Sequence, residues 1–275
     1  MTTSVNTNAG ALIALQNLNA TNAQLSTTQN RINTGLKVAG AKDNGAVWAI
    51  AQGQRAEIGA LGAVKASLDR GVSAVDVSLA AGESVSDLLL QLKEKALSAT
   101  DKSLTTAARS ALNEDFKAIR DQITTVTSNA DFNGINLLKT GATGFQALAN
   151  AAGSASLTVN AEVLALGSTN VTVTATTSIG TSTLATTAMG LVNDSIDKVS
   201  AALGRLGTKA RAIETHRTFV GKLSDALETG VGNLVDADLA KESARLQSLQ
   251  TKQQLGVQAL GIANQTPQVL LSLFR

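Results

Sequence analysis

The sequence predicts a mainly α-helical fold: a long helical hairpin or coiled-coil bundle with a small β-hairpin elaboration. Of its 275 residues, 45 are alanine and 36 are leucine, whereas only 2% are aromatic. The interior must therefore be built from small and aliphatic side chains, which suits closely packed helices. The single proline leaves long stretches without the residue that interrupts helices. Apolar residues also recur every seven positions, as in helices that pack along a common line of contact, here called a seam.

The first predicted element is a helix within residues 1–40. Leu18, Leu25 and Ile32 stand seven residues apart and form its seam. Gly35 and Gly40 follow, and glycine is typical of helix ends and turns. We therefore expect the helix to end there and a turn-rich connection to follow.

Three further seams predict the helices of the middle of the chain. Apolar residues at helical spacing occupy 61–79 and 112–126. A polar run ending at Ser103, a candidate N-cap, separates these two helices. Seven consecutive apolar positions at a period of seven run from Val192 to Leu234, which predicts a third and longer helix.

A block rich in serine and threonine interrupts the helical pattern. Fifteen of the 34 residues in 154–187 are Ser or Thr. Apolar and polar residues alternate in 157–163 and again in 171–176, and alternation with β-branched residues is typical of strands. We expect these two segments to pair as a β-hairpin that turns near Gly167.

Both ends of the chain lack charged side chains although both are rich in Leu and Ile. Residues 1–30 carry no charge, and 22 uncharged residues follow Lys252. Disordered ends are normally charge-rich and poor in such residues. We therefore expect about 1–35 and 240–275 to be buried against other copies of the chain and to fold only when copies assemble. The residues expected at this subunit–subunit interface are Leu15, Leu18, Leu25, Ile32, Leu246, Leu249, Leu260 and Leu270.

Uncharged amides interrupt the terminal seams. Asn22, Gln29 and Gln253 lie among the Leu and Ile residues. A buried polar side chain in a seam can fix the register of two helices at a cost in stability. Each amide either has this role or faces solvent, and the sequence leaves the two interpretations open.

The composition excludes most functional classes. With no cysteine and one histidine, thiol chemistry and metal sites that need cysteine or several histidines are absent, and we expect no cofactor. A net charge of +2 provides no basic field for nucleic acid, and no apolar run is long enough to span a membrane. Residues 230–232 lack the third glycine of a dinucleotide loop, so an enzyme is a poor alternative. His216 is expected to be an exposed helical residue, and the N-terminus has no signal-peptide pattern.

Three motifs together resemble bacterial flagellin, most closely the short flagellins of alphaproteobacteria. Residues 31–46 read RINTGLKVAGAKDNGA, similar to the family's N-terminal signature. Residues 130–138 read ADFNGINLL, similar to its Phe-Asn-Gly loop. Residues 240–275, from AKESARLQ to LLSLFR, are similar to its C-terminal end. The motifs occur in the family's order, and the resemblance covers about 1–145 and 188–275.

The resemblance implies a structural subunit, not an enzyme, that polymerises into the flagellar filament used for swimming. A hook–filament junction protein, which shares such ends, is the alternative. The implied inner-tube (D0-like) helices span 1–40 and 235–275. The implied rod (D1-like) spans 41–145 and 188–234, and the Ser/Thr-rich region 146–187 replaces the family's outer domains.

The resemblance also implies partners and a location. The partners are other copies of the chain (possibly with other flagellins), the type III export apparatus, a cytoplasmic chaperone on the C-terminal helix within 235–275, and hook-associated and cap proteins. Nucleic acid and membranes are not among them. The filament is secreted and extracellular. The run Gln91–Lys95 departs from the pattern recognised by the vertebrate innate receptor, so the resemblance does not extend to that interaction.

The Ser/Thr-rich region has a single charge, Glu162, between Lys139 and Asp194. An outward-facing segment of this kind has little else to keep it soluble, so we expect O-glycosylation; an unmodified polar hairpin is the alternative. The candidate positions are Ser168, Thr169, Thr172, Thr174, Thr176, Thr177, Ser178, Thr181, Ser182 and Thr183.

Overall fold

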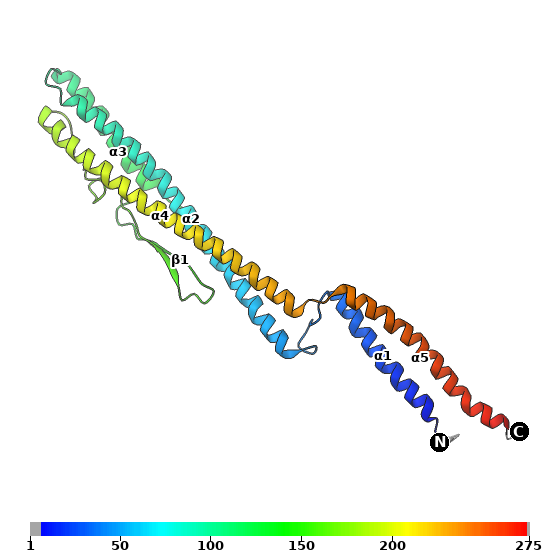
Figure 1. Cartoon of the computed structure of the whole chain (residues 1–275). Helices are drawn as coiled ribbons and strands as arrows, with labels where there is room; N and C mark the ends of the chain where they lie inside the picture. Colours follow the sequence, from blue (N-terminus) through cyan, green and yellow to red (C-terminus); the bar gives the residue numbers. More distant parts are fainter. Residues whose placement is uncertain (1–6, 274–275) are drawn as a thin grey trace. The chain divides into compact units, whose positions relative to one another are not determined.

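The computed structural model describes residues 7–273, and the side chains of residues 7–265 (Figure 1). Five helices and one two-stranded sheet form this part of the chain, which confirms the predicted fold class. The elements in order are α1 (Ala9–Thr34), α2 (Gly45–Ala99), α3 (Thr106–Asn129), β1 (Phe145–Leu148), β2 (Ser156–Val159), α4 (Ser182–Val235) and α5 (Leu239–Leu273).

The chain divides into two compact units. The terminal unit comprises Met1–Ala56 and Ala226–Arg275, and the middle unit comprises Glu57–Asp225. The terminal unit contains α1, α5 and the adjoining ends of α2 and α4. Trp48, the sole tryptophan, lies half-buried in the first turn of α2 within this unit.

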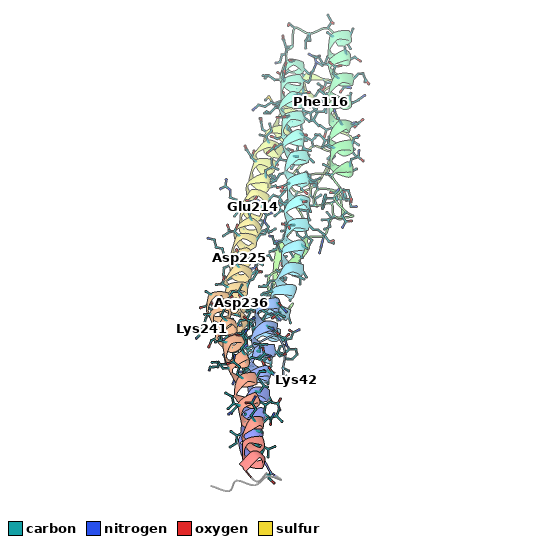
Figure 2. The ribbon with its side chains drawn as sticks, turned by 90° about the vertical axis from the view of Figure 1, so that its right-hand side faces the viewer. Lys42, Phe116, Glu214, Asp225, Asp236 and Lys241 are labelled. Atoms are coloured by element: carbon teal, nitrogen blue, oxygen red, sulfur yellow. The ribbon has the colours of Figure 1, made fainter. Side chains whose placement is uncertain are left out.

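The middle unit has a core of aliphatic side chains between α2, α3 and α4, which run side by side (Figure 1). Phe116 on α3 is its one fully buried aromatic ring among the described residues (Figure 2). Arg120, on the same helix, is also buried and donates to the carbonyl of Thr177, so it ties the Ser/Thr-rich segment to α3. Leu68, Leu89, Leu92, Ile123, Leu206 and Ile213 are among the fully buried side chains.

The predicted seam of α4 is buried over most of its length. Its first five members, from Val192 to Val220, are buried, but Leu227 and Leu234 are only half-buried. Val231 and Val235 are buried in their place. A straight α-helix drifts about 20° per heptad, so a strict period of seven moves off a fixed face after several repeats. The eleven-residue step from Val220 to Val231 corrects this drift.

The β-hairpin lies earlier in the chain than the sequence predicted. Phe145 pairs with Val159 and Leu148 with Ser156, antiparallel, so the turn lies between these strands and not near Gly167. The segment 171–176 is not a strand. Val171 and Val173 are buried, while Thr172 donates to the carbonyl of Leu191 on α4 and its amide donates to Ser195. The segment 171–176 therefore contacts the helix α4 through Thr172 and does not pair with a second strand.

Short loops join the helices of the middle unit. The N-cap of α3 is Thr105, whose side chain accepts from Ala108 N, and not Ser103 as predicted. After α3, Asn133 and Gly134 both adopt positive φ angles, 52° and 83°, between Phe132 and Ile135, whose backbones exchange two hydrogen bonds. This is the Asn-Gly geometry of a tight hairpin turn. It accounts for the Phe-Asn-Gly motif of the sequence.

Replacing Phe116 with alanine should lower the free energy of unfolding of the middle unit by about 3–5 kcal/mol, because the change removes a fully buried ring and leaves a cavity. Urea denaturation followed by far-UV circular dichroism measures this change. Phe219→Ala is the matched control: its ring is exposed, so the loss should stay below about 1 kcal/mol. Equal losses for the two variants would contradict the assignment of the core.

Candidate functional site: an apolar surface on the paired terminal helices

The terminal helices α1 and α5 form an antiparallel pair within the terminal unit (Figure 1). Asn8 caps α1 by accepting from Ala11 N, and its amide also donates to the carbonyl of Ala263 on α5 at 2.7 Å. Near the other end of the pair, Arg31 meets Glu242. Asp238 caps the start of α5 by accepting from Lys241 N; Figure 2 labels Lys241 and Asp236. The side chains at the helix ends thus fix both the start and the register of the pair.

The seam of the pair follows the predicted heptad spacing. On α1 the least exposed positions include Leu18, Leu25 and Ile32, and on α5 they include Leu246 and Leu249. Leu249 is only 3% exposed, so this predicted interface residue is already covered within one chain. The other four are half-buried, as is Leu260. Leu15, in contrast, is 43% exposed, and Leu270 lies outside the residues whose side chains are described.

Small and polar residues occupy much of the same seam. Thr28 is buried, and a side chain at Gly256 would meet Leu18 Cδ1 at 3.2 Å, so the helices approach closely there. Gln253, which is half-buried, donates to Asn22 across the pair at 2.8 Å, but Asn22 itself is exposed to solvent. Gln29 is exposed. A seam of this composition buries little apolar surface per turn.

Backbone hydrogen bonds tie the two segments that lead into the pair. Lys37 N and Val38 N both donate to the carbonyl of Val235, at 2.7 and 3.2 Å. Ala237 N donates to the carbonyl of Gly35, which ends α1 with a φ of 70°. The left-handed conformation favours glycine, which explains the helix end expected at this residue. These bonds hold the end of α1 beside the start of α5.

The sides of α1 and α5 that face away from the seam carry large exposed apolar side chains. Ile13 is 61% exposed and Ile262 is 69% exposed. Monomeric soluble proteins rarely expose many such residues together, and patches of this kind mark interaction surfaces. The heptad spacing of the sequence identified the positions that pack between α1 and α5, but it missed most of the exposed apolar residues. The exposed set near one end of the pair, here called the terminal apolar surface, consists of Leu12, Ile13, Leu15, Leu255, Val257 and Ile262; Leu239, also exposed, lies at the other end of α5.

The absence of charge was the sequence signal that could have identified this surface. A helix that is half-exposed in a finished structure normally carries charged residues on its outer face. Neither 7–30 nor 253–265 contains any. Apolar residues off the seam in an uncharged helix therefore point to a second contact surface.

The candidate glycosylation residues fall into two groups by exposure. The half-buried ones include Ser168 and Ser182, whose hydroxyls donate to the carbonyls of Val163 and Thr100, and Thr172, described above. Thr177 and Ser178 are also half-buried. The exposed candidates are Thr169, Thr174, Thr176, Thr181 and Thr183.

His216 is not the exposed helical residue that was expected. Its side chain is half-buried, and Nε2 lies 2.7 Å from the carbonyl oxygen of Ala149 in the hairpin turn. A carbonyl only accepts, so Nε2 carries the proton and donates. The histidine thus fastens the hairpin to α4. No group of three or more potential metal ligands was found among the described residues, and none of the described helices is long and apolar enough to cross a membrane.

Comparisons with known proteins cover nearly the whole chain. Residues 5–143 match the bacterial flagellin N-terminal helical region, and residues 189–274 match the bacterial flagellin C-terminal helical region. Flagellin FljM of Caulobacter vibrioides is 57% identical over 99% of this chain and 98% of its own length. A flagellin of Brucella melitensis is 37% identical, with 99% of each chain covered.

A solved structure shares the fold. The Vibrio parahaemolyticus protein, assigned to the flagellar hook-associated class, superposes with a TM-score of 0.58, covering 70% of this chain and 100% of its own at 13% identity. At that identity the likeness concerns the fold alone. The two helical regions, together with relatives similar from end to end, show that this chain belongs to the bacterial flagellin family.

Proposed function

We propose that the chain is the structural subunit of a bacterial flagellar filament, built by helical polymerisation and used for swimming. The observation that carries the proposal is end-to-end similarity to flagellins, at 57% identity to one of them. The terminal apolar surface supplies the physical basis, because copies of the chain can bury it against one another. Contacts between different patches of identical subunits generate open helical polymers when the rotation between copies does not close a ring.

The hook–filament junction alternative is not favoured. The relatives that match over almost their whole length are named flagellins. The hook-associated structure is similar in fold but only 13% identical. The proposed structural role does not require catalysis, so we do not propose an enzymatic activity.

Within the filament, we assign 1–40 and 235–275 to an inner tube and 41–145 and 188–234 to a surrounding rod, with 146–187 facing outward. The support is the distribution of charge: residues 1–30 and 253–274 carry no charged side chain and are rich in apolar residues, whereas the rod segments carry most of the charges. Burying uncharged apolar residues is favourable, and burying unpaired charges is costly. The interface then comprises the exposed residues of the terminal apolar surface and the half-buried seam residues.

The absence of cysteine and the exposed apolar residues of α5 also support export through a type III channel with the help of a chaperone. A chain without cysteine forms no disulfide that would block threading through a narrow type III channel. Before export, Leu255, Val257 and Ile262 would be exposed on α5, and a cytoplasmic chaperone that covers them would prevent aggregation. Hook-associated and cap proteins would contact the two ends of the polymer, outside the cell.

Ile13→Glu should abolish assembly without unfolding the monomer. Ile13 is largely exposed in the single chain, so a charge there is hydrated until neighbours bury it. Electron microscopy and sedimentation of the purified protein measure assembly, and circular dichroism measures folding. Leu18→Glu is less informative because Leu18 also packs in the seam beside Gly256.

Leu148→Glu is the matched control for this experiment. Leu148 is an exposed leucine in the hairpin of the middle unit, and it should tolerate glutamate with normal filaments. Filaments of normal length from Ile13→Glu would refute the assignment of α1 to the interface.

Proteolysis should remove the terminal helices first in the monomer. The sequence predicted that these segments fold only on assembly, whereas α1 and α5 are helical and paired in the single chain. Because leucines alternate with Thr, Gly and amide residues along their seam, we expect the pair to be the least stable region of the fold. Limited trypsin digestion of the monomer, followed by mass spectrometry, should cut at Arg31 and Lys241 before cutting the middle unit. In filaments the same sites should be protected, and equal cleavage in both states would contradict the coupling of stability to assembly.

We also propose O-glycosylation at the five exposed threonines Thr169, Thr174, Thr176, Thr181 and Thr183. The mass of the protein from native filaments, measured by intact mass spectrometry, should exceed the sequence mass of 28.0 kDa. Replacing the five threonines with alanine should return the mass to that of the altered sequence. An unshifted mass for the native protein would exclude the modification.

A further inference from the structure

The ion pair at the base of the terminal helix pair is incomplete within one chain. Arg31 Nη1 lies 3.1 Å from Glu242 Oε1, with 27% and 11% of the two side chains exposed. Arg31 Nε and Glu242 Oε2 are buried, and neither has a hydrogen-bond partner among the described residues. A buried polar atom without a partner costs more than an exposed one, and more still when its group is charged. Among the described residues, the Arg31 guanidinium is therefore paired only through Nη1.

A polar groove of about 240 Å³ lies beside this pair. Arg31 and Arg245 are among the residues that line it, and none of its lining residues is acidic. Arg245 is exposed and takes part in none of the ion pairs found among the described residues. Guanidinium groups bind carboxylates with paired, directional hydrogen bonds. The remaining lining residues are Ala23, Gln24, Thr27 and Thr28.

The net charge of the helix pair indicates which part of the chain can supply a carboxylate to this groove. In 7–34 and 239–265, Glu242 is the only acidic residue, against Arg31, Lys241, Arg245 and Lys252. A polymer that gathers many copies of this pair also gathers their excess positive charge. Twenty of the chain's 21 acidic residues lie outside α1 and α5 and can supply the balance from a neighbouring copy.

We propose that the groove formed by Arg31 and Arg245 binds a carboxylate side chain of a second copy of this chain. The inference rests on the proposed filament. It assigns to the assembly a specific polar contact in addition to the apolar one: the incoming carboxylate accepts from the exposed Arg245 and lies beside the partly exposed side chain of Arg31. Apolar contacts are non-directional, whereas this contact fixes the position of the neighbouring copy.

Zero-length cross-linking tests the proposal on the full-length chain. Arg245→Lys retains the positive charge and supplies an amine that a water-soluble carbodiimide joins to any carboxylate in direct contact. Treated filaments should yield a covalent dimer whose cross-linked peptide joins position 245 to an Asp or Glu of another copy, and treated monomers should not. Filaments that give no such dimer, or that give only a link to Glu242 within one chain, would overturn the proposal.

A charge-loss pair supplies an independent measurement. Arg245→Gln should raise the critical concentration for assembly about tenfold, the effect of losing one charge-assisted hydrogen bond. Lys252→Gln removes the same charge one heptad further along α5, outside the groove, and should change the critical concentration less than about twofold. Equal effects would mean that net charge alone matters and would overturn the site. Failure of the unaltered chain to form filaments would instead overturn the proposed function.

Discussion

The contact between α1 and α5 is confined to one side of each helix, and the behaviour of the terminal unit depends on this restriction. Along the seam, leucines alternate with Thr, Gly and amide residues, so little apolar surface is buried there. The opposite sides carry Leu, Ile and Val in contact with water and lack the charges that normally accompany exposure. Copies of the chain can bury these sides against one another, whereas the middle unit has a buried core of its own and leaves only scattered large apolar residues such as Leu90, Leu97 and Phe219 exposed.

The helices of this fold could be predicted from the sequence because a period of seven survives along each of them. The seam from Val192 to Val220 is buried as expected, and only the accumulated drift of the helix displaces it to Val231. The hairpin could not be placed correctly. Alternating Val and Thr at 171–176 looks the same whether the partner is a strand or, as here, the surface of α4. Only the tertiary contacts distinguish the two arrangements.

The candidate site was predictable in kind but not in detail. The uncharged ends identified the terminal helices, yet heptad spacing selected residues such as Leu249, which pack within the chain. The exposed Ile13 and Ile262 follow no seam, so only their accessibility identifies them. The groove beside Arg31 was also invisible to sequence reasoning, since it joins residues more than 200 positions apart.

Trp48 provides a fluorescence signal that comes from the terminal unit alone. The chain contains no tyrosine and no second tryptophan, so its near-ultraviolet absorption and intrinsic fluorescence come almost wholly from this one indole. The ring lies half-buried at the start of α2, in the same unit as α1 and α5. Fluorescence therefore reports on the terminal unit, whereas far-ultraviolet dichroism is an average over the helices of both units. A difference between the two melting curves would reveal directly that the units unfold in separate transitions.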